Sequence, residues 1–404
     1  MIFVLNRVFS NKATPAQIKQ HNAALLLREI YAREAISRVQ LAHLTGLSRP
    51  SVTELTQGLI EKGLICELGP ENTIDKVGKK AQLLALNPDA YQMVCIAVSN
   101  SAVTGSLFNL RAQEIKHEAL RLDGAQEEEV VRLIIQVAEK LIVQATCPIL
   151  GVAVGTPGIV DTQTGVVYLA ASLGWQNLPL SQVLIDRFHL PVCIGNDSNM
   201  AAVGEYRFGK AQGAKDLVLV EVGEGIGIGI ISDGRIIEGN TSAAGELGHT
   251  PFTSLEDECI CGRRGCLETK VSWWAIRRQA ECITQEHADA PLHRLANGAP
   301  VTTTIIRQAL VEEDPYVMRL VDEAATYLGM ALIMVMHLLN PKHIVLTGSM
   351  LELGEPFIGR VRRTIQERSL PYISSHVEII TNPSDEHSIL LGAGAFLLQR
   401  ELGL

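Results

Sequence analysis

The residues best suited to chemistry lie in one short run in the second half of the chain. Three cysteines and one histidine fall within eighteen residues, and two glycines lie between the last two cysteines. Thiolate sulfur and imidazole nitrogen suit zinc, and turns that contain glycine allow four such ligands to converge. A site with four protein ligands has no open position for water, so the metal is expected to be structural. The expected ligands of one zinc ion per chain are His249, Cys259, Cys261 and Cys266.

The alternative for this run is a group of ordinary buried thiols near a surface histidine. The dense Cys-x-Cys-x4-Cys spacing, with a histidine ten residues upstream, favours the metal site. One glutamate flanks the run on each side, Glu246 and Glu268. A bound ion would therefore also fix the positions of two carboxylates.

Composition indicates a compact protein of several domains. The chain has 404 residues, of which 47% are hydrophobic and 20% are charged, so it can bury large cores in roughly two or three domains. The other five cysteines are scattered in apolar surroundings, and the start of the chain lacks a signal-peptide pattern. The apolar segment 328–339 is too short to cross a bilayer. We expect a cytoplasmic protein with reduced thiols and no membrane partner.

Charge is distributed unevenly along the chain. The net charge is −9, but residues 1–88 carry 11 basic and 7 acidic side chains, whereas the remainder carries 24 and 37. A basic segment on an acidic body indicates that only residues 1–88, the head, contact a polyanion.

The head has the pattern of a helix-turn-helix. One helix begins at Thr14-Pro15 and a second at Ser37, and the turn Thr45-Gly46-Leu47 leads to a third helix that Ser48 caps. The last helix of such a motif enters the major groove of DNA. The alternative is a small helical packing or dimerisation domain.

Two strands at 64–68 and 82–86 complete the head. They predict a hairpin with lysines at its tip, which makes the motif a winged helix whose wing can contact phosphates. We therefore expect operator DNA as a partner. The expected DNA contacts are Ser48, Arg49, Ser51, Thr53 and Gln57 on the third helix, and Lys79 and Lys80 on the wing.

The rest of the chain, from about residue 89, has the pattern of a duplicated α/β fold. Three strands, a long helix and a further strand are expected between residues 94 and 154, and a similar order of strands begins again at residue 217. This order implies two α/β halves around a cleft, with a ligand between them.

Three segments resemble the ROK family, which comprises repressors, open reading frames and sugar kinases. They are Gly245 to Glu268, Gly151 to Gly158, and the pair Asn196-Asp197. The resemblance implies an α/β fold: a winged helix-turn-helix followed by a two-lobed actin-like, hexokinase-like (ribonuclease H-like) body with structural zinc. An N-terminal winged helix is similar to the family's transcriptional repressors, including xylose and N-acetylglucosamine repressors, and is absent from its kinases. The implied domains are the winged helix (1–88), a first lobe (89–196 with the C-terminal helix 386–404) and a second lobe with the zinc loop and sugar site (197–385).

The same resemblance implies a sugar site. Sugar hydroxyls require paired hydrogen-bond acceptors and donors, which carboxylate, amide and imidazole groups supply. His249 would bind zinc through one ring nitrogen and the sugar through the other. Taken singly, Asp197 could instead be a helix cap, and Glu246 or Glu268 a solvated carboxylate. The implied sugar contacts are Asn177, Asn196, Asp197, Glu246, His249 and Glu268.

The loops that bind phosphate in the family's kinases are altered. Those kinases carry Asp-x-Gly-Gly-Thr-Lys between their first two strands, whereas the matching positions 97–102 read Ala-Val-Ser-Asn-Ser-Ala. In the second loop, 223–229, Glu224 places an anion where a hydroxyl residue is expected, and the remaining glycines fit tightly packed strands. ATP binding and catalysis are therefore not expected.

These observations predict a sugar-responsive DNA-binding repressor of carbohydrate-metabolism genes that acts as a homodimer or homotetramer. The alternatives are an active ATP-dependent sugar kinase with an accessory N-terminal domain, and a scaffold that binds protein partners through the head.

Overall fold

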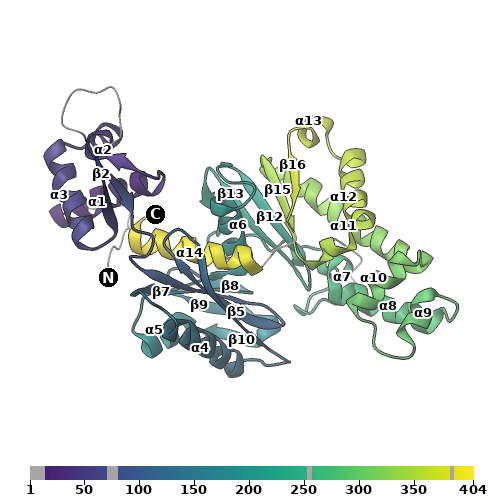
Figure 1. The fold of residues 1–404 in the computed structure, drawn as a ribbon. Coiled ribbons are helices and arrows are strands. Elements are labelled where there is room, and N and C mark those ends of the chain that lie inside the picture. The colour runs from purple at the N-terminus through teal and green to yellow at the C-terminus, as the bar shows by residue number, and fades with distance from the viewer. Residues whose placement is uncertain (1–13, 71–80, 253–256, 383–385) are drawn as a thin grey trace.

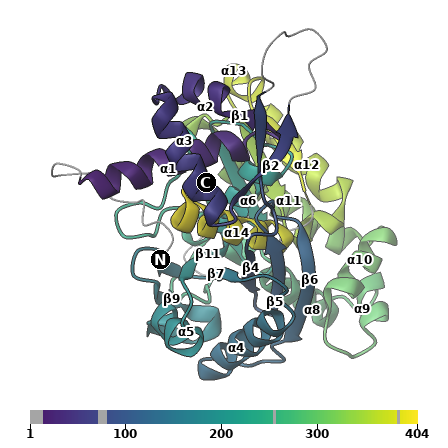
Figure 2. The same cartoon turned by 60° about the vertical axis from the view of Figure 1, so that its left-hand side comes forward.

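The structure is a computed structural model, and it describes residues 14–70, 81–252, 257–382 and 386–404. Lys79 and Lys80, the two wing residues expected to contact DNA, lie outside these ranges. The head lies at one end of the molecule, and the C-terminus of the chain lies beside it (Figures 1 and 2).

In its described residues, 14–70 and 81–88, the head contains helices and a sheet of order β1-β3-β2. Thr14, Ser37 and Ser48 each cap a helix by accepting a hydrogen bond from the backbone N–H three residues later. Gly46 ends the second helix with a φ of 70°, a conformation that glycine adopts without strain. The elements are α1 (Pro15–Tyr31), β1 (Ile36–Ser37), α2 (Arg38–Thr45), α3 (Arg49–Glu61), β2 (Ile65–Pro70) and β3 (Gln82–Leu86).

The body contains two five-stranded sheets with the same topology, which confirms the expected duplication. The first sheet has the order β11-β7-β4-β5-β6 and the second has β14-β13-β12-β15-β16. In each sheet the first three strands along the chain pair antiparallel, and the next two are added parallel to the first. The strands of the first sheet are β4 (Gln92–Val98), β5 (Ala102–Asn109), β6 (Glu114–Arg121), β7 (Ile149–Thr156) and β11 (Val192–Asn196). Those of the second are β12 (Leu217–Val222), β13 (Ile226–Ser232), β14 (Arg235–Ile236), β15 (His343–Thr347) and β16 (Glu378–Thr381).

Further elements surround each sheet. A small antiparallel sheet of order β10-β9-β8, which the sequence did not indicate, accompanies the first sheet. With it are β8 (Ile159–Asp161), β9 (Val166–Ala170), η1 (Ala171–Leu173), β10 (Trp175–Leu178), α4 (Glu128–Val143) and α5 (Leu180–Phe188). With the second sheet are η2 (Leu247–His249), α7 (Glu268–Val271), α8 (Trp273–Glu286), α9 (Pro291–Ala296), α10 (Thr303–Val311), α11 (Pro315–Leu339), η3 (Ser349–Leu353), α12 (Glu355–Arg368) and α13 (Pro371–Ser374).

The apolar segment 328–339 belongs to a longer helix than the sequence indicated. The helix, α11, has 25 residues, which is long and apolar enough to cross a membrane. It also has charged side chains in its first half, which is why the apolar run alone underestimates its length. Of its most apolar window 56% is buried inside the second half of the body, as expected for a core helix.

Two helices, α6 (Asp197–Phe208) and α14 (Glu386–Leu402), lie side by side between the sheets (Figure 1). Helix α6 packs on β12 and β13 of the second sheet, whereas α14 packs on β4 and β7 of the first. Their backbones approach closely: a Cβ atom on Gly392 would lie 1.7 Å from the carbonyl oxygen of Met200, and one on Gly204 would lie 2.1 Å from that of Ser388. Glycine at both positions therefore allows the two helices to touch.

We expect Gly392→Ala to lower the free energy of unfolding by about 1–3 kcal/mol, because the methyl group would push α14 away from α6. Gly394→Ala is the matched control on the same helix, since the nearest atom to its Cβ is 3.5 Å away. The control should be neutral or more stable by about 0.5–1 kcal/mol, the helix preference of alanine over glycine. Denaturant unfolding measures both variants. Equal stability of the two would contradict the close contact.

Candidate metal and sugar site

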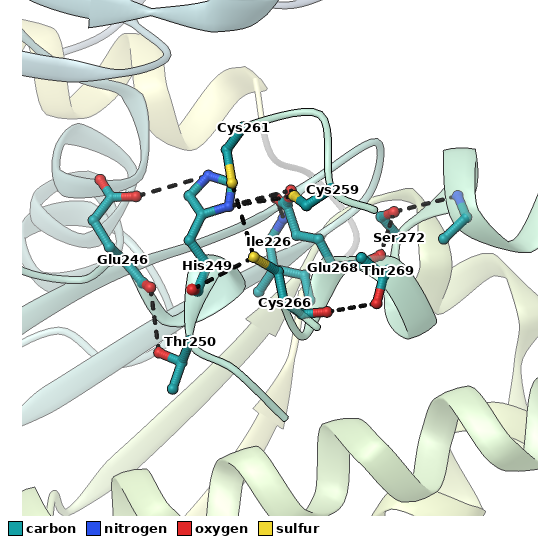
Figure 3. A network of polar contacts seen from close by, with 11 residues as sticks. Ile226, Glu246, His249, Thr250, Cys259, Cys261, Cys266, Glu268, Thr269 and Ser272 are labelled. Atoms are coloured by element: carbon teal, nitrogen blue, oxygen red, sulfur yellow. Dashed lines mark hydrogen bonds and ion pairs between the residues drawn. The ribbon is translucent and has the colours of Figure 1, made fainter. Parts of the chain in front are cut away.

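The cysteine cluster, consisting of His249, Cys259, Cys261 and Cys266, forms as the sequence predicts. One ligand atom from each residue lies within 4.8 Å of all the others. Cys261 Sγ and Cys266 Sγ are 3.8 Å apart, and Cys259 Sγ is 3.7 Å from His249 Nδ1 (Figure 3). Tetrahedral ligands around zinc, with bonds of about 2.0 and 2.3 Å, lie about 3.5–3.8 Å apart. The four residues therefore fit this metal.

The loop that carries the cluster depends on glycine. Gly262 and Gly265 have φ values of 81° and 76°, which place both in the left-handed region between the last two cysteines. The backbone N–H of Cys259 donates to the carbonyl of Arg263 over 2.8 Å, across the turn that contains Gly262. The result is a tight hairpin that brings the thiols of the loop together.

Two thiols of the cluster do not readily ionise without a cation beside them. Burial raises the pKa of Cys259 to about 12, and it also raises the pKa of Cys266. Without a cation beside them these thiols would keep their protons at neutral pH, whereas a bound metal ion stabilises thiolates. The donor set is therefore consistent with a site that binds its metal with release of protons.

Asp197 and Glu246 form the centre of an acidic site, which we define as Asp197, Glu246, His249 and Glu268. Burial, with a smaller contribution from the charge of Glu246, raises the pKa of Asp197 to about 6. The backbone N–H of Ser198, which donates to Asp197 Oδ1 over 2.7 Å, acts in the opposite direction. Burial also raises the pKa of Glu246, with His249 opposing and Glu268 adding to the rise. This acidic site has more acceptors than donors, which suits a ligand with several hydroxyl groups.

His249 faces both groups of residues. Its Nδ1 atom lies toward the cysteine cluster, and its Nε2 atom is 4.0 Å from Glu246 Oε2 (Figure 3). The two ring nitrogens are thus available for the two roles that the resemblance implied, a metal through one and a sugar through the other.

Glu268 has a different environment from the other carboxylates. Its side chain is only 7% exposed, and Oε1 accepts a hydrogen bond of 2.8 Å from the backbone N–H of Ile226 at the start of β13. Its Oε2 atom is 3.8 Å from His249 Nδ1 and 3.9 Å from Cys259 Sγ. The carboxylate therefore connects the cysteine cluster to β13, and its contact with a sugar stays a prediction.

The two asparagines that are expected to contact the sugar have different surroundings from these carboxylates. Asn196 is the cap of α6: its side chain accepts from the backbone N–H of Asn199 and donates to the carbonyl of Gly158, each over 3.0 Å. Asp197 is the first helical residue, so the cap role considered for it belongs to its neighbour, because the helix begins earlier in the chain than that alternative assumed. Asn177 is exposed on β10, with a left-handed φ of 52°. Sugar contact by either amide stays a prediction.

The residues expected to contact DNA lie at the start of α3 and along its outer face. Four of the five are exposed, and Ser51 is half-buried. Ser51 and Ser48 share a hydrogen bond of 2.8 Å between their hydroxyl oxygens. Arg49, the first residue of α3, is an exposed cation at the N-terminal end of this helix.

Both turns that match phosphate-binding loops of the family's kinases form hydrogen bonds or ion pairs with side chains of the protein itself. In the turn between β4 and β5, Ser99 Oγ accepts hydrogen bonds from the backbone N–H groups of Ser101 and Ala102. In the turn between β12 and β13, the carboxylate of Glu224 binds the guanidinium of Arg277 on α8 in a bidentate pair of 2.8 and 2.7 Å. Sequence reasoning missed Arg277, because its partner lies 53 residues away and no local pattern connects them.

The glycines of the second turn have packing roles, as the sequence indicated. A Cβ atom on Gly227 would lie 2.0 Å from Ser198 Oγ, and one on Gly229 would lie 2.3 Å from the carbonyl of Ser198. A Cβ atom on Gly225 would lie 2.7 Å from Glu268 Oε1. These glycines allow α6 and Glu268 to approach β13.

The sequence and fold match a known family. The ROK family description covers residues 93–400. The chain belongs to the ROK family. This ROK chain is 30% identical to the xylose repressor of Caldicellulosiruptor bescii over 94% of its own length and 96% of that protein. It is 32% identical to a glucokinase of Halalkalibacterium halodurans, over only 63% of its own length and 77% of that enzyme.

A solved structure supports the same assignment for this ROK chain. The crystal structure of a ROK family transcriptional regulator, a homolog of the Escherichia coli MLC protein, has a TM-score of 0.80 at 25% identity. The match covers 96% of this chain and 100% of the other. Likeness to the two regulators thus extends over nearly the whole ROK chain, and the expected two-lobed α/β fold is confirmed.

Proposed function

We propose that this ROK protein is a sugar-responsive transcriptional repressor of carbohydrate-metabolism genes. The proposal rests mainly on two features that occur together. The acidic site is present, and the two loops that match the phosphate-binding loops of the family's kinases bind side chains of the protein itself. The near full-length likeness to a xylose repressor and to a ROK regulator supports it. The protein would bind a sugar without transforming it, and the head would bind operator DNA.

The head is proposed to be a winged helix-turn-helix with α3 as its recognition helix. The left-handed Gly46 between α2 and α3 and the exposed polar residues at the start of α3 support this role. The half-sites of an operator are read by a symmetric pair of heads, so we propose a homodimer or a homotetramer.

We expect Arg49→Ala to weaken operator binding by about 10- to 100-fold, because the side chain is an exposed cation at the start of α3, where a recognition helix contacts base edges. The probe is a DNA duplex that the full chain selects from a random library, titrated by fluorescence anisotropy at fixed salt. Arg132→Ala, which removes an exposed arginine of α4 paired with Glu129, is the control and should bind as the unmodified protein does. Failure of the full chain to select any sequence would contradict the repressor function.

Sugar is proposed to bind at the acidic site, through Asp197, Glu246 and His249, with Asn177, Asn196 and Glu268 as further contacts. Burial raises the pKa values of Asp197 and Glu246 because it disfavours their charged form. Ligand hydroxyls that donate hydrogen bonds to these two carboxylates would stabilise that charged form. One zinc ion, bound by the cysteine cluster, is proposed to hold His249 and Glu268 in position.

Kinase activity is not part of the proposal. A phosphate group would need backbone N–H donors, and in the turn between β4 and β5 Ser99 accepts two of them. At the second turn Arg277 is bound by Glu224, so its guanidinium is already occupied by a carboxylate of the protein. A coupled ATP-consumption assay with D-xylose, D-glucose and N-acetyl-D-glucosamine should show no turnover above the rate without protein. Turnover that Asp197→Asn abolishes would instead establish the kinase alternative.

A further inference from the structure

The contact between the head and the body includes residues from both halves of the body. Tyr31, the last residue of α1, lies where they meet. Arg111, in the turn after β5 of the first sheet, places its guanidinium carbon 4.8 Å from the centre of the Tyr31 ring. The same guanidinium donates hydrogen bonds to the backbone carbonyls of Tyr31 and Arg33. The first half of the body therefore holds the end of α1.

The second half reaches Tyr31 through Arg207. This residue lies next to the last position of α6, and its side chain forms a hydrogen bond with the side chain of Tyr31. Tyr31 is half-buried between the two arginines. Because Arg111 lies in the turn that joins β5 and β6 of the first sheet, and α6 packs on the second, a rotation of one half against the other changes the surroundings of Tyr31.

Helix α6 also begins in the acidic site. Asp197 is its first residue, and its 12 residues span about 18 Å. One rigid helix therefore joins the proposed sugar site to the head. Tight packing of Gly227 and Gly229 against Ser198 holds the start of this helix against β13 of the second sheet.

Helix α14 provides a second contact with the head. Its close glycine contact with α6 couples the two helices, and the Arg28 side chain of α1 donates to the backbone carbonyl of Gly403, just after the end of α14. Leu398, Leu402 and Leu404 belong to the same buried apolar cluster as residues of α1. In Figure 2 the C-terminus lies directly at α1. The described residues of the head therefore pack on the body in one continuous apolar core.

We propose that Tyr31, held between Arg111 of the first half and Arg207 at the end of α6, couples the acidic site to the orientation of the head. This inference rests on the proposed function. A sugar at the start of α6 shifts the second half against the first, and the displacement of Arg207 relative to Arg111 reorients α1 and with it α3. Tyr31 and Arg207 are positioning residues: neither touches sugar or DNA.

The test measures how strongly sugar changes DNA affinity in the full chain. The probes are the duplex selected from a random library and the sugars D-xylose, D-glucose and N-acetyl-D-glucosamine. For each protein, the response ratio is the Kd for the duplex with saturating sugar divided by the Kd without sugar. Calorimetry gives the sugar Kd in the absence of DNA, and thermal unfolding verifies the fold.

Tyr31→Phe removes only the hydroxyl that Arg207 binds, and Arg207→Met removes the other partner. We expect each variant to lower the response ratio by about fivefold, the value of one hydrogen bond, with the sugar Kd within about twofold of the unmodified protein. The double variant should lower it no further, because both changes remove the same contact. Tyr372→Phe and Arg294→Met, which alter an exposed tyrosine of α13 and an exposed arginine of α9, are the controls and should leave the ratio unchanged.

The outcomes separate this inference from the function on which it rests. A response ratio of one in the unmodified protein, with every sugar, contradicts both. A ratio above about ten that persists in Tyr31→Phe and Arg207→Met contradicts the coupling alone. Weaker DNA binding by the same factor with and without sugar would mean a purely structural role for Tyr31, and it would likewise overturn the inference.

Discussion

Asp197→Asn is expected to make the protein more stable at pH 7 and to weaken sugar binding. Burial raises the pKa of Asp197 to about 6, above the value of 3.8 for the free side chain, so the folded state holds this proton more tightly than the unfolded state. Below pH 3.8 this carboxyl group does not lower the free energy of unfolding, because it is protonated in both states. The loss of free energy of unfolding grows as the pH rises from 3.8 to about 6. At pH 7 the folded protein therefore carries a penalty of about 1–3 kcal/mol that asparagine removes.

The same substitution removes the strongest acceptor of the acidic site. A hydrogen bond to a charged group contributes about 1.5–3 kcal/mol, so the Kd for the sugar should rise by about 10- to 100-fold. Calorimetry measures the Kd, and urea unfolding at pH 4 and pH 7 measures stability. The stabilisation should be present at pH 7 and largely lost at pH 4.

Asp186→Asn, at an exposed position of α5, is the matched control and should change neither quantity. A variant Asp197→Asn that is less stable than the unmodified protein at pH 7 would show that the carboxylate stabilises the fold. The acidic site would then have a structural role, and the sugar assignment would lose its main support.

Removal of the metal is expected to have the other large effect. Cys261→Ser should lose the zinc ion, and with it about 3 kcal/mol of stability, because the metal cross-links a loop of 18 residues from His249 to Cys266. The sugar Kd should rise by about tenfold or more, since His249 Nδ1 and Glu268 Oε2 lie together beside the cluster and would lose their fixed positions.

Elemental analysis of the purified protein should give one zinc per chain, and none in Cys261→Ser. Cys282→Ser, which alters an exposed cysteine of α8 outside the cluster, should keep its metal and its sugar Kd. A protein that contains no zinc, or a Cys261→Ser variant with unchanged sugar affinity, would falsify the positioning role of the metal.

The sequence predicted those features that depend only on residues close to one another in the chain. The caps at Thr14, Ser37 and Ser48 each need only a hydroxyl and a backbone donor three residues away, so they could be read from the sequence. The cysteine cluster could also be predicted, because its ligands lie within one loop. The duplicated strand order followed from two runs of alternating strands and helices.

Contacts between distant segments could not be predicted in this way. Arg277 binds Glu224, and Arg111 binds the end of α1, but neither arginine differs by sequence pattern from any surface arginine. Gly204 and Gly392 are 188 positions apart in the chain. Their role, which is to let α6 and α14 pack closely, can be recognised only when the two helices are seen together. The hydrogen bonds of Asn196 to the start of α6 and to Gly158 were likewise not expected from the sequence, and its contact with a sugar stays a prediction.

We expect a sugar bound at the acidic site to weaken binding of the head to DNA. The most direct test of this expectation is an anisotropy titration of the selected duplex with the full chain, with and without each sugar at a concentration that calorimetry shows to be saturating. At least one sugar should raise the Kd for DNA by about tenfold or more, and the variant Asp197→Asn should need about 10- to 100-fold more of that sugar for the same effect. An unchanged Kd for DNA, with the acidic site saturated, would contradict this expectation.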